Sequence, residues 1–293
     1  TDSTVSVFLV DDATGQLRPR GYVISGDSPR AVAVHPSGQF FYTINGGLSN
    51  NVSANALSAT GLVTAVTGSP FPLRNPNGPT AVAVSPNGLF LFVANANPIS
   101  SNVSVLSINQ TTGVLTEISN SPFPLAPAAG PTAIAVHPSG NLLFVTNNNP
   151  GTLFVFTIQS TGFLTPIGFP VPLLPNPQAL VLNAAGTVVY VANNGSNSNP
   201  SIPGNDSISA FLVNQTNGGL SQIGSPFFTG PGTAPSSVAV GPGGQFLYVA
   251  NSGTGTIGLF PINQVTGALS AGGTAVTVAN PQFIRIDPDG STL

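Results

Sequence analysis

One phrase returns six times along this sequence, and the repetition constrains the fold more than any other feature. Each copy holds Pro, a polar residue, an Ala/Val-rich stretch, a Pro/Gly-type turn and an aromatic-rich stretch that ends at Asn. The copies begin at Ser28, Gly78, Gly130, Asn176, Ala234 and Asn280. The last copy reaches Leu293 before its aromatic stretch. Such self-similarity indicates repeated supersecondary units that bury their apolar faces against one another.

A second phrase fills the gaps between these copies. It is an alternating stretch, a Thr-Gly turn and a further short stretch, so that each unit reads as four short strands. Its copies begin near Thr4, Asn51, Asn102, Thr152, Asp206 and Thr256. The turn glycines of the first phrase recur every 46 to 58 residues, from Gly38 to Gly290. We therefore predict an all-β fold, a β-propeller of four-stranded antiparallel blades in a single domain, residues 1–293.

The two ends of the chain complement each other. The first residues resemble the segment that comes after the Asn of an inner hairpin, and the last repeat lacks its second inner strand. We predict six blades, one of them closed by pairing N-terminal outer strands with C-terminal inner strands. Seven blades remain the alternative. An unclosed ring would offer its strand edges to a neighbouring molecule, and the missing start Met suggests an excised segment.

The composition excludes several classes of function. Charged residues make up 4% of the chain, against about 25% in ordinary domains, and the formal net charge is −3. This excludes the basic surface that nucleic acid requires. Without Cys there is no thiolate metal site, and the apolar runs are too short to span a membrane. We expect no cofactor, no metal and no membrane insertion, and an Asn/Ser/Thr-rich surface suited to an extracellular or cell-surface location.

The inner hairpin GPTAIAVHPSGNLLFVTN, with its variants FVAN and YVAN, resembles the Tyr-Val-Thr-Asn repeat family of β-propellers. The resemblance covers nearly the whole chain and implies the propeller fold. That family includes lactonases similar to 6-phosphogluconolactonase, which typically have seven blades, and proteins similar to surface-layer components. The resemblance alone does not choose between an enzyme and a structural module.

The polar residue after each repeat Pro is the candidate binding position. In chain order these residues are Arg30, Thr80, Thr132, Gln178, Ser236 and Gln282. In a propeller they would form a polar ring at one channel mouth, with Arg30 as its cation. Arg285 adds a second charge where other repeats have Ala. The ring would bind a small molecule or glycan, or simply line a water-filled channel.

The remaining ionisable residues argue against catalysis. His35 and His137 open the hairpin turns at the opposite end of the inner strands, where we expect them to cap local backbone. Glu117 lies in an outer strand and is expected to be solvated. Asp287 and Asp289 suggest calcium only weakly. Because no His, Glu or Lys falls on the Arg30 side, the catalytic residues remain unknown and an enzyme is disfavoured.

Asn-Xaa-Ser/Thr sequons suggest a glycosylated surface. They occur at Asn51, Asn102, Asn109, Asn194, Asn205 and Asn214. The sequence thus predicts an extracellular structural or binding module, part of a cell-surface or filamentous assembly, whose partners are glycans or further copies of itself. The alternative is a lactonase-like hydrolase, similar to 6-phosphogluconolactonase, acting at the channel mouth.

Overall fold

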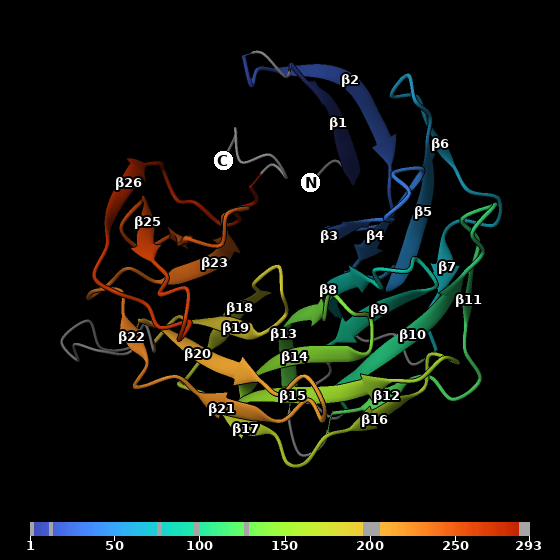
Figure 1. Ribbon diagram of the computed structural model, residues 1–293. Helices are drawn as coiled ribbons and strands as arrows, with labels where there is room; N and C mark the ends of the chain where they lie inside the picture. The colour runs from blue at the N-terminus through green and yellow to red at the C-terminus, as the bar shows by residue number, and fades with distance from the viewer. Residues whose placement is uncertain are drawn as a thin grey trace. The chain divides into compact units, whose positions relative to one another are not determined.

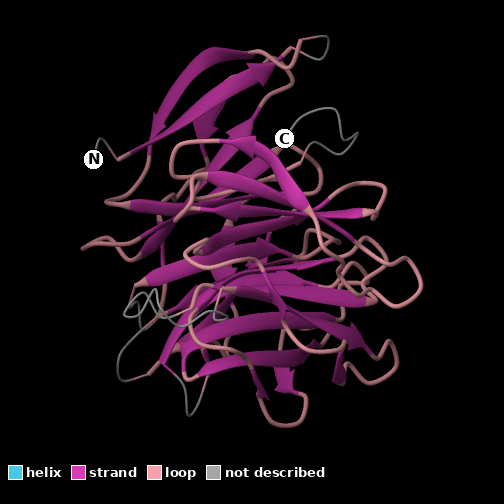
Figure 2. Cartoon of the chain, turned by 90° about the vertical axis from the view of Figure 1, so that its left-hand side faces the viewer, coloured by secondary structure: helices cyan, strands magenta, loops and turns pink. Residues whose placement is uncertain are grey.

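The computed structural model describes residues 3–11, 14–74, 78–96, 100–125, 129–195 and 206–286. These residues form strands, turns and loops without any helix (Figure 2), and so this part of the chain holds no helix that could cross a membrane. The chain divides into two compact units. Unit 1 is Thr1–Val136 with Ile158–Thr165, and unit 2 is His137–Thr157 with Pro166–Leu293.

Unit 1 contains a hairpin and two five-stranded sheets (Figure 1). The hairpin is β1 (Thr4–Val10) and β2 (Leu17–Ile24). The first sheet comprises β3 (Pro29–Val34), β4 (Phe40–Asn45), β5 (Asn51–Leu57), β6 (Val63–Ala65) and β7 (Phe71–Pro72). The second comprises β8 (Pro79–Val84), β9 (Phe90–Asn95), β10 (Asn102–Ile108), β11 (Leu115–Glu117) and β12 (Phe123–Pro124). Strand β13 (Ala129–Val136) and the start of β16 (Leu164–Pro166) complete the unit.

Unit 2 repeats this plan. Its strands are β14 (Leu142–Asn149), β15 (Gly151–Ile158), β17 (Val171–Pro172), β18 (Pro177–Leu182), β19 (Val188–Asn193), β20 (Ser207–Val213), β21 (Leu220–Gln222), β22 (Phe227–Phe228), β23 (Pro235–Val240), β24 (Phe246–Asn251), β25 (Thr256–Pro261) and β26 (Gly273–Thr277). Strands β18 to β22 form a five-stranded sheet and β23 to β26 a four-stranded one. The prediction of four-stranded antiparallel units is therefore confirmed.

Each sheet has two faces with different side chains. On the β3–β7 sheet, Ala33 lies opposite Tyr42 and Val32 lies opposite Thr43, so the two strands share a tyrosine face and a valine face. The valine face of the β8–β12 sheet packs against the tyrosine face of the β3–β7 sheet, with Val82 and Val84 beside Tyr42. Burying one such side chain contributes about 1.5–3 kcal/mol, so this repeated contact is the main source of stability.

The same face-to-face contact recurs twice in unit 2. Tyr190 of one sheet packs with Val238 and Val249 of the next. On the far side of that sheet, Ala239 and Tyr248 pack against Ile284 and Ile286. The tyrosine hydroxyl extends each contact, because Tyr190 Oη donates to Gly267 O at 2.8 Å, as Tyr42 Oη does to Gly113 O at 3.4 Å in unit 1.

Residues 281–286 depart from the predicted pattern. The repeat predicts an inner strand here, but the structure assigns none. The segment still lies along β23, since Ser236 Oγ donates to Pro281 O (2.8 Å) and Ile284 N to Ser237 Oγ (3.2 Å). A strand needs a ladder of backbone hydrogen bonds, and the described residues place no second hairpin strand beside it. The predicted pairing of the chain ends, and the single domain, remain predictions.

Two-residue strands are a feature that the sequence analysis missed. Strands β7, β12, β17 and β22 each pair with the start of the third strand of their sheet. They come from the segments between repeats, such as Phe71–Pro72, which pairs with Val52 and Asn51. A Pro in a two-residue strand gives no alternation pattern, so periodicity could not reveal it.

Candidate functional site

The polar residue after each repeat Pro sits at a backbone irregularity. In four hairpins the register shifts between the Pro and the second residue after it, which leaves Arg30, Thr80, Gln178 and Ser236 as the unpaired residues of a bulge. Bulges bend a strand, re-aim a side chain and are frequent next to active sites. The predicted binding position is therefore special in backbone as well as in side chain.

The residue before the Pro has a left-handed backbone in all six copies. The φ angles are 54° at Ser28, 59° at Gly78, 92° at Gly130, 59° at Asn176, 47° at Ala234 and 47° at Asn280. Glycine adopts this region freely, whereas for Ser and Ala it costs about 1 kcal/mol. Two glycines among six residues were too weak a signal for the sequence to reveal a shared conformation.

Arg30 and Asp27 flank a glycine pair in unit 1. A Cβ on Gly46 would lie 2.5 Å from Arg30 Nε, and a Cβ on Gly47 would overlap Asp27 Oδ2. The loop from Gly46 to Ser49 holds Asp27 from two sides, because Leu48 N donates to Asp27 Oδ2 (3.1 Å) and Asp27 N donates to Ser49 Oγ (2.8 Å). The side chains of Arg30 and Asp27 thus approach the backbone of the same turn. Only glycine at positions 46 and 47 leaves room for them.

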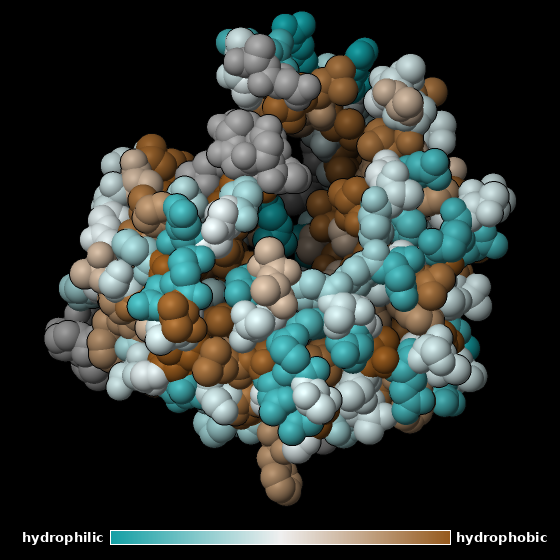
Figure 3. All heavy atoms as spheres, in the orientation of Figure 1, coloured by the Kyte–Doolittle hydropathy of each residue, from teal (hydrophilic) through white to brown (hydrophobic). Residues whose placement is uncertain are grey.

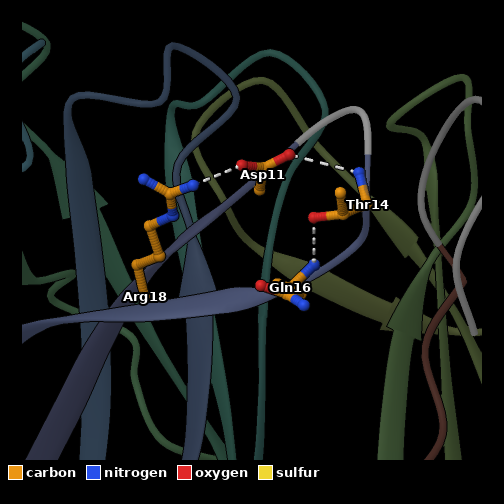
Figure 4. A network of polar contacts seen from close by, with 4 residues as sticks. All are labelled: Asp11, Thr14, Gln16 and Arg18. Carbon is orange, nitrogen blue, oxygen red and sulfur yellow. Dashed lines mark hydrogen bonds and ion pairs between the residues drawn. The ribbon is translucent and has the colours of Figure 1, made fainter.

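Arg30 is exposed and has no hydrogen-bond or ion-pair partner within the described ranges. Arg18, by contrast, has a partner in the β1–β2 turn, where its Nη2 lies 2.7 Å from Asp11 Oδ2 (Figure 4). A cation left free beside a fixed carboxylate is suited to binding an anion or a polarised carbonyl.

Thr80 and Ser236 serve the structure. Thr80 Oγ1 donates to Pro131 O at 2.7 Å and Ser236 Oγ to Pro281 O at 2.8 Å, and each also reaches a carbonyl of its own hairpin partner, Ala94 or Ala250, at 3.2 Å. These hydroxyls link one inner strand to the next segment. In unit 1 this brings Thr80 beside Pro131 and Thr132, one strand away from Arg30.

The two glutamines and Arg285 of unit 2 make local contacts. Gln178 Nε2 donates to Asn176 Oδ1 (2.7 Å) and Gln282 Nε2 to Asn280 Oδ1 (2.6 Å). The guanidinium of Arg285 lies 4.6 Å from the centre of the Phe283 ring, and its desolvated surroundings lower the pKa of Arg285. The Phe283 ring is therefore a partner of this charge.

Glu117 is not a solvated surface group, contrary to the sequence analysis. Its Oε2 accepts a hydrogen bond from Arg74 N (2.6 Å) and its Oε1 one from Ser121 Oγ (2.6 Å). The Arg74 guanidinium in turn donates to Ile118 O (2.9 Å) and Ser119 O (3.1 Å). These residues are 43 to 45 positions apart in sequence, so no local pattern could predict their contact.

Asp206 and the two buried tyrosines are also structural. Asp206 accepts hydrogen bonds from Gly195 N (3.0 Å) and Ala234 N (3.2 Å). Burial raises the pKa of Tyr190 to about 12 and that of Tyr42 further, so both phenols stay protonated and act only as donors. Neither tyrosine is available as a general base near neutral pH.

The histidines cap their turns as predicted and do more. His35 Nδ1 lies 2.8 Å from Ser37 Oγ and accepts from Ser37 N at 3.2 Å. Its Nε2 lies 3.2 Å from Gly88 O in the next sheet, so the second nitrogen carries the proton. His137 repeats this pattern, 3.0 Å from Gly186 O. The cross-sheet bond was missed because the sequence shows only the turn itself.

The turn end of the β3–β7 sheet has a cavity of about 600 Å³. It is lined by residues of the β3–β4 and β5–β6 turns, among them Ser37, Phe40, Ser58 and Leu62, and by no ionisable side chain. Among the residues that the structure describes, no three His, Asp or Glu gather as a metal site. Asp287 and Asp289 lie outside those residues.

The sequons fall in varied surroundings. Asn102 is buried, and its Nδ2 donates to Ser100 O at 3.1 Å, which leaves no room for a glycan. Asn51 Oδ1 accepts from Asn45 (2.8 Å). Asn109 and Asn214 are exposed turn residues, Asn194 is half-buried and Asn205 lies outside the described residues.

The fold and its repeated inner hairpins define a class of β-propeller, and comparison with known families identifies which one. The model of the family "Lactonase, 7-bladed beta-propeller" matches residues 1–182 and 174–286, so the chain belongs to this lactonase family. Among the described residues there are five sheets of four or five strands, and the β1–β2 hairpin forms a separate two-stranded sheet. Seven is the family's blade number, the alternative to the six predicted above.

Two curated relatives carry the same name. A 6-phosphogluconolactonase of Formosa agariphila is 29% identical over 165 residues, which cover 56% of this chain and 43% of that protein. A 6-phosphogluconolactonase of Bacillus subtilis is 30% identical over 180 residues, 59% of this chain and 48% of that protein. The chain therefore spans about half the length of the curated relatives it matches.

Solved structures agree on the fold. A Bacteroides uniformis protein assigned as a 6-phosphogluconolactonase matches with a TM-score of 0.79 at 20% identity, over 96% of this chain and 81% of that one. The periplasmic gluconolactonase of Pseudomonas aeruginosa matches with a TM-score of 0.52 at 18% identity, over 94% and 93%. At such identities the likeness shows the fold alone.

These findings correct the main functional prediction. The sequence analysis favoured an extracellular structural or binding module and disfavoured an enzyme, but the family and both curated relatives are lactonases. The lactonase-like half of the predicted resemblance is confirmed, and the surface-layer half is not supported. The error came from requiring His, Glu or Lys at the Arg30 side, although an Asp–Arg pair can supply both a base and a cation. The extracellular location and the glycan or self partners remain predictions.

Proposed function

We propose that this protein is a lactonase-like hydrolase that opens a sugar lactone beside Arg30 and Asp27. The observation that carries the proposal is the lactonase family match along nearly the whole chain. The two relatives named 6-phosphogluconolactonase suggest a phosphorylated gluconolactone as the substrate to test first. The Arg30 end of unit 1 supports it, because it combines a free cation with a positioned carboxylate.

Hydrolysis of a lactone requires a base and a stabilised oxyanion. Water adds to the ring carbonyl carbon and loses a proton, the carbonyl oxygen becomes negative, and the C–O bond of the ring then breaks to give a carboxylic acid and an alcohol. Asp27 takes the proton of the attacking water and returns it to the departing ring oxygen. Arg30 stabilises the negative charge on the carbonyl oxygen.

The glycine turn brings these two roles together. Cα atoms of neighbouring residues such as Gly46 and Gly47 are about 3.8 Å apart, so side chains that contact them lie near one another. Leu48 N holds one oxygen of Asp27 and leaves the other free for a water molecule. The Arg30 guanidinium approaches Gly46 without any carboxylate partner of its own among the described residues, which keeps its charge available to a substrate.

The test is an assay of lactone hydrolysis with 6-phosphogluconolactone and unphosphorylated glucono-δ-lactone. The wild type should release acid faster than the spontaneous reaction, and Arg30→Gln and Asp27→Asn should each lower kcat/KM by about 100-fold or more. Arg20→Gln is the matched control, since Arg20 is an exposed arginine on β2.

A wild type no faster than the spontaneous reaction would refute the lactonase proposal. Wild-type activity in both Arg30→Gln and Asp27→Asn would keep the lactonase but refute this site. If Arg30→Gln lost activity only toward the phosphorylated substrate, the role of Arg30 would be to bind the phosphate rather than to stabilise the carbonyl oxygen.

A further inference from the structure

The segment that carries Asp27 is tied to the end of β4. The face of unit 1 visible in Figure 3 mixes hydrophilic and hydrophobic side chains, so surface chemistry alone does not mark this segment. Ser25 Oγ donates to Asn45 Oδ1 at 2.6 Å, and Asn45 is fully buried. Asn45 Nδ2 in turn donates to Asn51 Oδ1 (2.8 Å) and Ser53 Oγ (2.9 Å) of β5. Ser25 is therefore bonded to a side chain that is itself fixed on its other side.

Further contacts connect this anchor to the carboxylate. A Cβ on Gly26 would lie 2.7 Å from Asn45 Nδ2, so the backbone before Asp27 rests directly on the Asn45 amide. On the other side of Asp27, Ser28 O accepts a hydrogen bond from Gly46 N at 2.9 Å. Asp27 is therefore part of a short segment that is fixed at both ends, in addition to the contacts that its own oxygen and nitrogen make with the loop after β4.

The hydrogen bond from Ser25 distinguishes the first repeat from the others. Four asparagines equivalent to Asn45 have an Oδ1 that is buried without a hydrogen-bond partner in the part of the chain that the structure describes: Asn95, Asn147, Asn193 and Asn251. In unit 2 the residues aligned with Ser25 are Leu173 and Pro231, whose side chains have no donor. Their hairpins nevertheless keep the register of the first, with the repeat Pro opposite the Asn. The hairpin therefore does not need the hydrogen bond from Ser25 in order to form.

The first repeat is also the one with a carboxylate at the Asp27 position. The residues aligned with Asp27 in the other repeats are Asn77, Ala129, Pro175, Thr233 and Ala279. The paired oxygen of Asn45 thus occurs in the same repeat as the candidate general base. We propose that Ser25 is a positioning residue, whose hydrogen bond to Asn45 holds the Asp27 carboxylate where it receives the proton of the attacking water. This inference rests on the proposed lactonase function.

Loss of the Ser25 hydroxyl should affect kcat more than KM. Proton transfer needs the base within hydrogen-bond reach of the water, about 2.6–3.2 Å between heavy atoms, and is sensitive to small displacements. Without the bond to Asn45, the segment before Asp27 gains conformational freedom, and the carboxylate spends less time in the reactive position. Arg30 lies beyond the repeat Pro and is not held by this bond, so binding of the lactone changes little.

The test measures kcat and KM of the full chain with whichever of the two lactones above the wild type hydrolyses faster. Ser25→Ala should lower kcat about tenfold and change KM by less than about twofold, whereas Ser25→Thr keeps the hydroxyl and should stay within about threefold of the wild-type kcat. Ser252→Ala is the matched control, because Ser252 Oγ donates to Ala234 O (2.9 Å) at the loop end of unit 2. It should leave kcat unchanged.

A double variant separates positioning of the base from a general loss of structure. If Ser25 acts through Asp27, adding Ser25→Ala to Asp27→Asn should lower kcat no further. Circular dichroism checks that the variants are folded, and if Ser25→Ala does not fold, comparison of Ser25→Thr with Ser25→Val tests the same hydroxyl at constant shape.

The outcomes distinguish this inference from the lactonase proposal. An active wild type with an unchanged kcat in Ser25→Ala, or a further tenfold fall of kcat in the double variant, overturns the positioning role of Ser25 alone. A wild type no faster than the spontaneous reaction refutes the lactonase function and the positioning role together.

Discussion

The inner strands of unit 1 end in two different ways. At the turn end, polar groups are matched: His35 bonds to Ser37 and to Gly88 O, and Gln110 Nε2 donates to the same carbonyl at 2.8 Å. At the loop end, Arg30 has no partner among the described residues, and Asn95 Oδ1, at the end of β9, is buried without one. Matched groups fix a structure, whereas unmatched ones have bonding capacity left for water or a ligand. The contrast supports the proposal that places the chemistry at the loop end.

Substitution of Gly88, which lies against the His35 ring, is expected to have the largest effect on stability. Gly88 has φ +75°, and a Cβ there would overlap the His35 ring and lie 2.9 Å from Gln110 Oε1. We expect Gly88→Ala to lower the free energy of unfolding by about 2–4 kcal/mol. Gly38→Ala is the matched control, because Gly38 has φ +70° with no atom within 4 Å, and it should cost about 1 kcal/mol. Equal losses in denaturant titrations would show that the turn end is not tightly packed.

Two substitutions of His35 separate the stabilisation from the local cap from that of the cross-sheet hydrogen bond. His35→Ala removes both and should lower the free energy of unfolding by about 2–3 kcal/mol. His35→Asn should lower it by about 1 kcal/mol, since Asn183 shows that an Asn caps this turn by accepting from Val188 N (3.0 Å). Denaturant titration of both variants measures the difference. If Asn and Ala are equally destabilising, the bond to Gly88 O rather than the cap carries the effect.

The smallest effect is expected at the loop end and has the opposite sign. Ala234 precedes its repeat Pro with φ +47°. Ala234→Gly should raise the free energy of unfolding by about 0.5–1 kcal/mol, because glycine removes the left-handed strain at the position that Gly78 and Gly130 already fill with glycine. Gly78→Ala is the reverse control and should destabilise by at least as much, since its Cβ would lie 3.0 Å from Ala96 O. A destabilised Ala234→Gly in a thermal melt would contradict the interpretation of this turn as strained.

The sequence predicts the architecture well because strand pattern and turn chemistry repeat at short range. The Pro-Ser-Gly turn after His35 and the alternation in β3 needed no tertiary information. The site was harder. Arg30 was identified from its place after the Pro, but only the folded loop brings the carboxylate of Asp27 to the same glycine turn. Long-range contacts such as that between Arg74 and Glu117 leave no local signal at all.

The tyrosine contacts have a consequence for how such a chain can change length. Two repeats carry a donor, the hydroxyl of Tyr42 or Tyr190, whose acceptor is the carbonyl of a turn glycine, Gly113 or Gly267. The copies between them have Phe92 and Phe144 at the corresponding position and keep only the apolar contact. Donor and acceptor belong to neighbouring copies, so a duplicated repeat arrives with one half of the contact it makes on each side. Because the apolar contact is made with either Tyr or Phe, gain or loss of a whole copy changes at most this one hydrogen bond at a junction, and the number of repeats can vary without any new interface having to evolve.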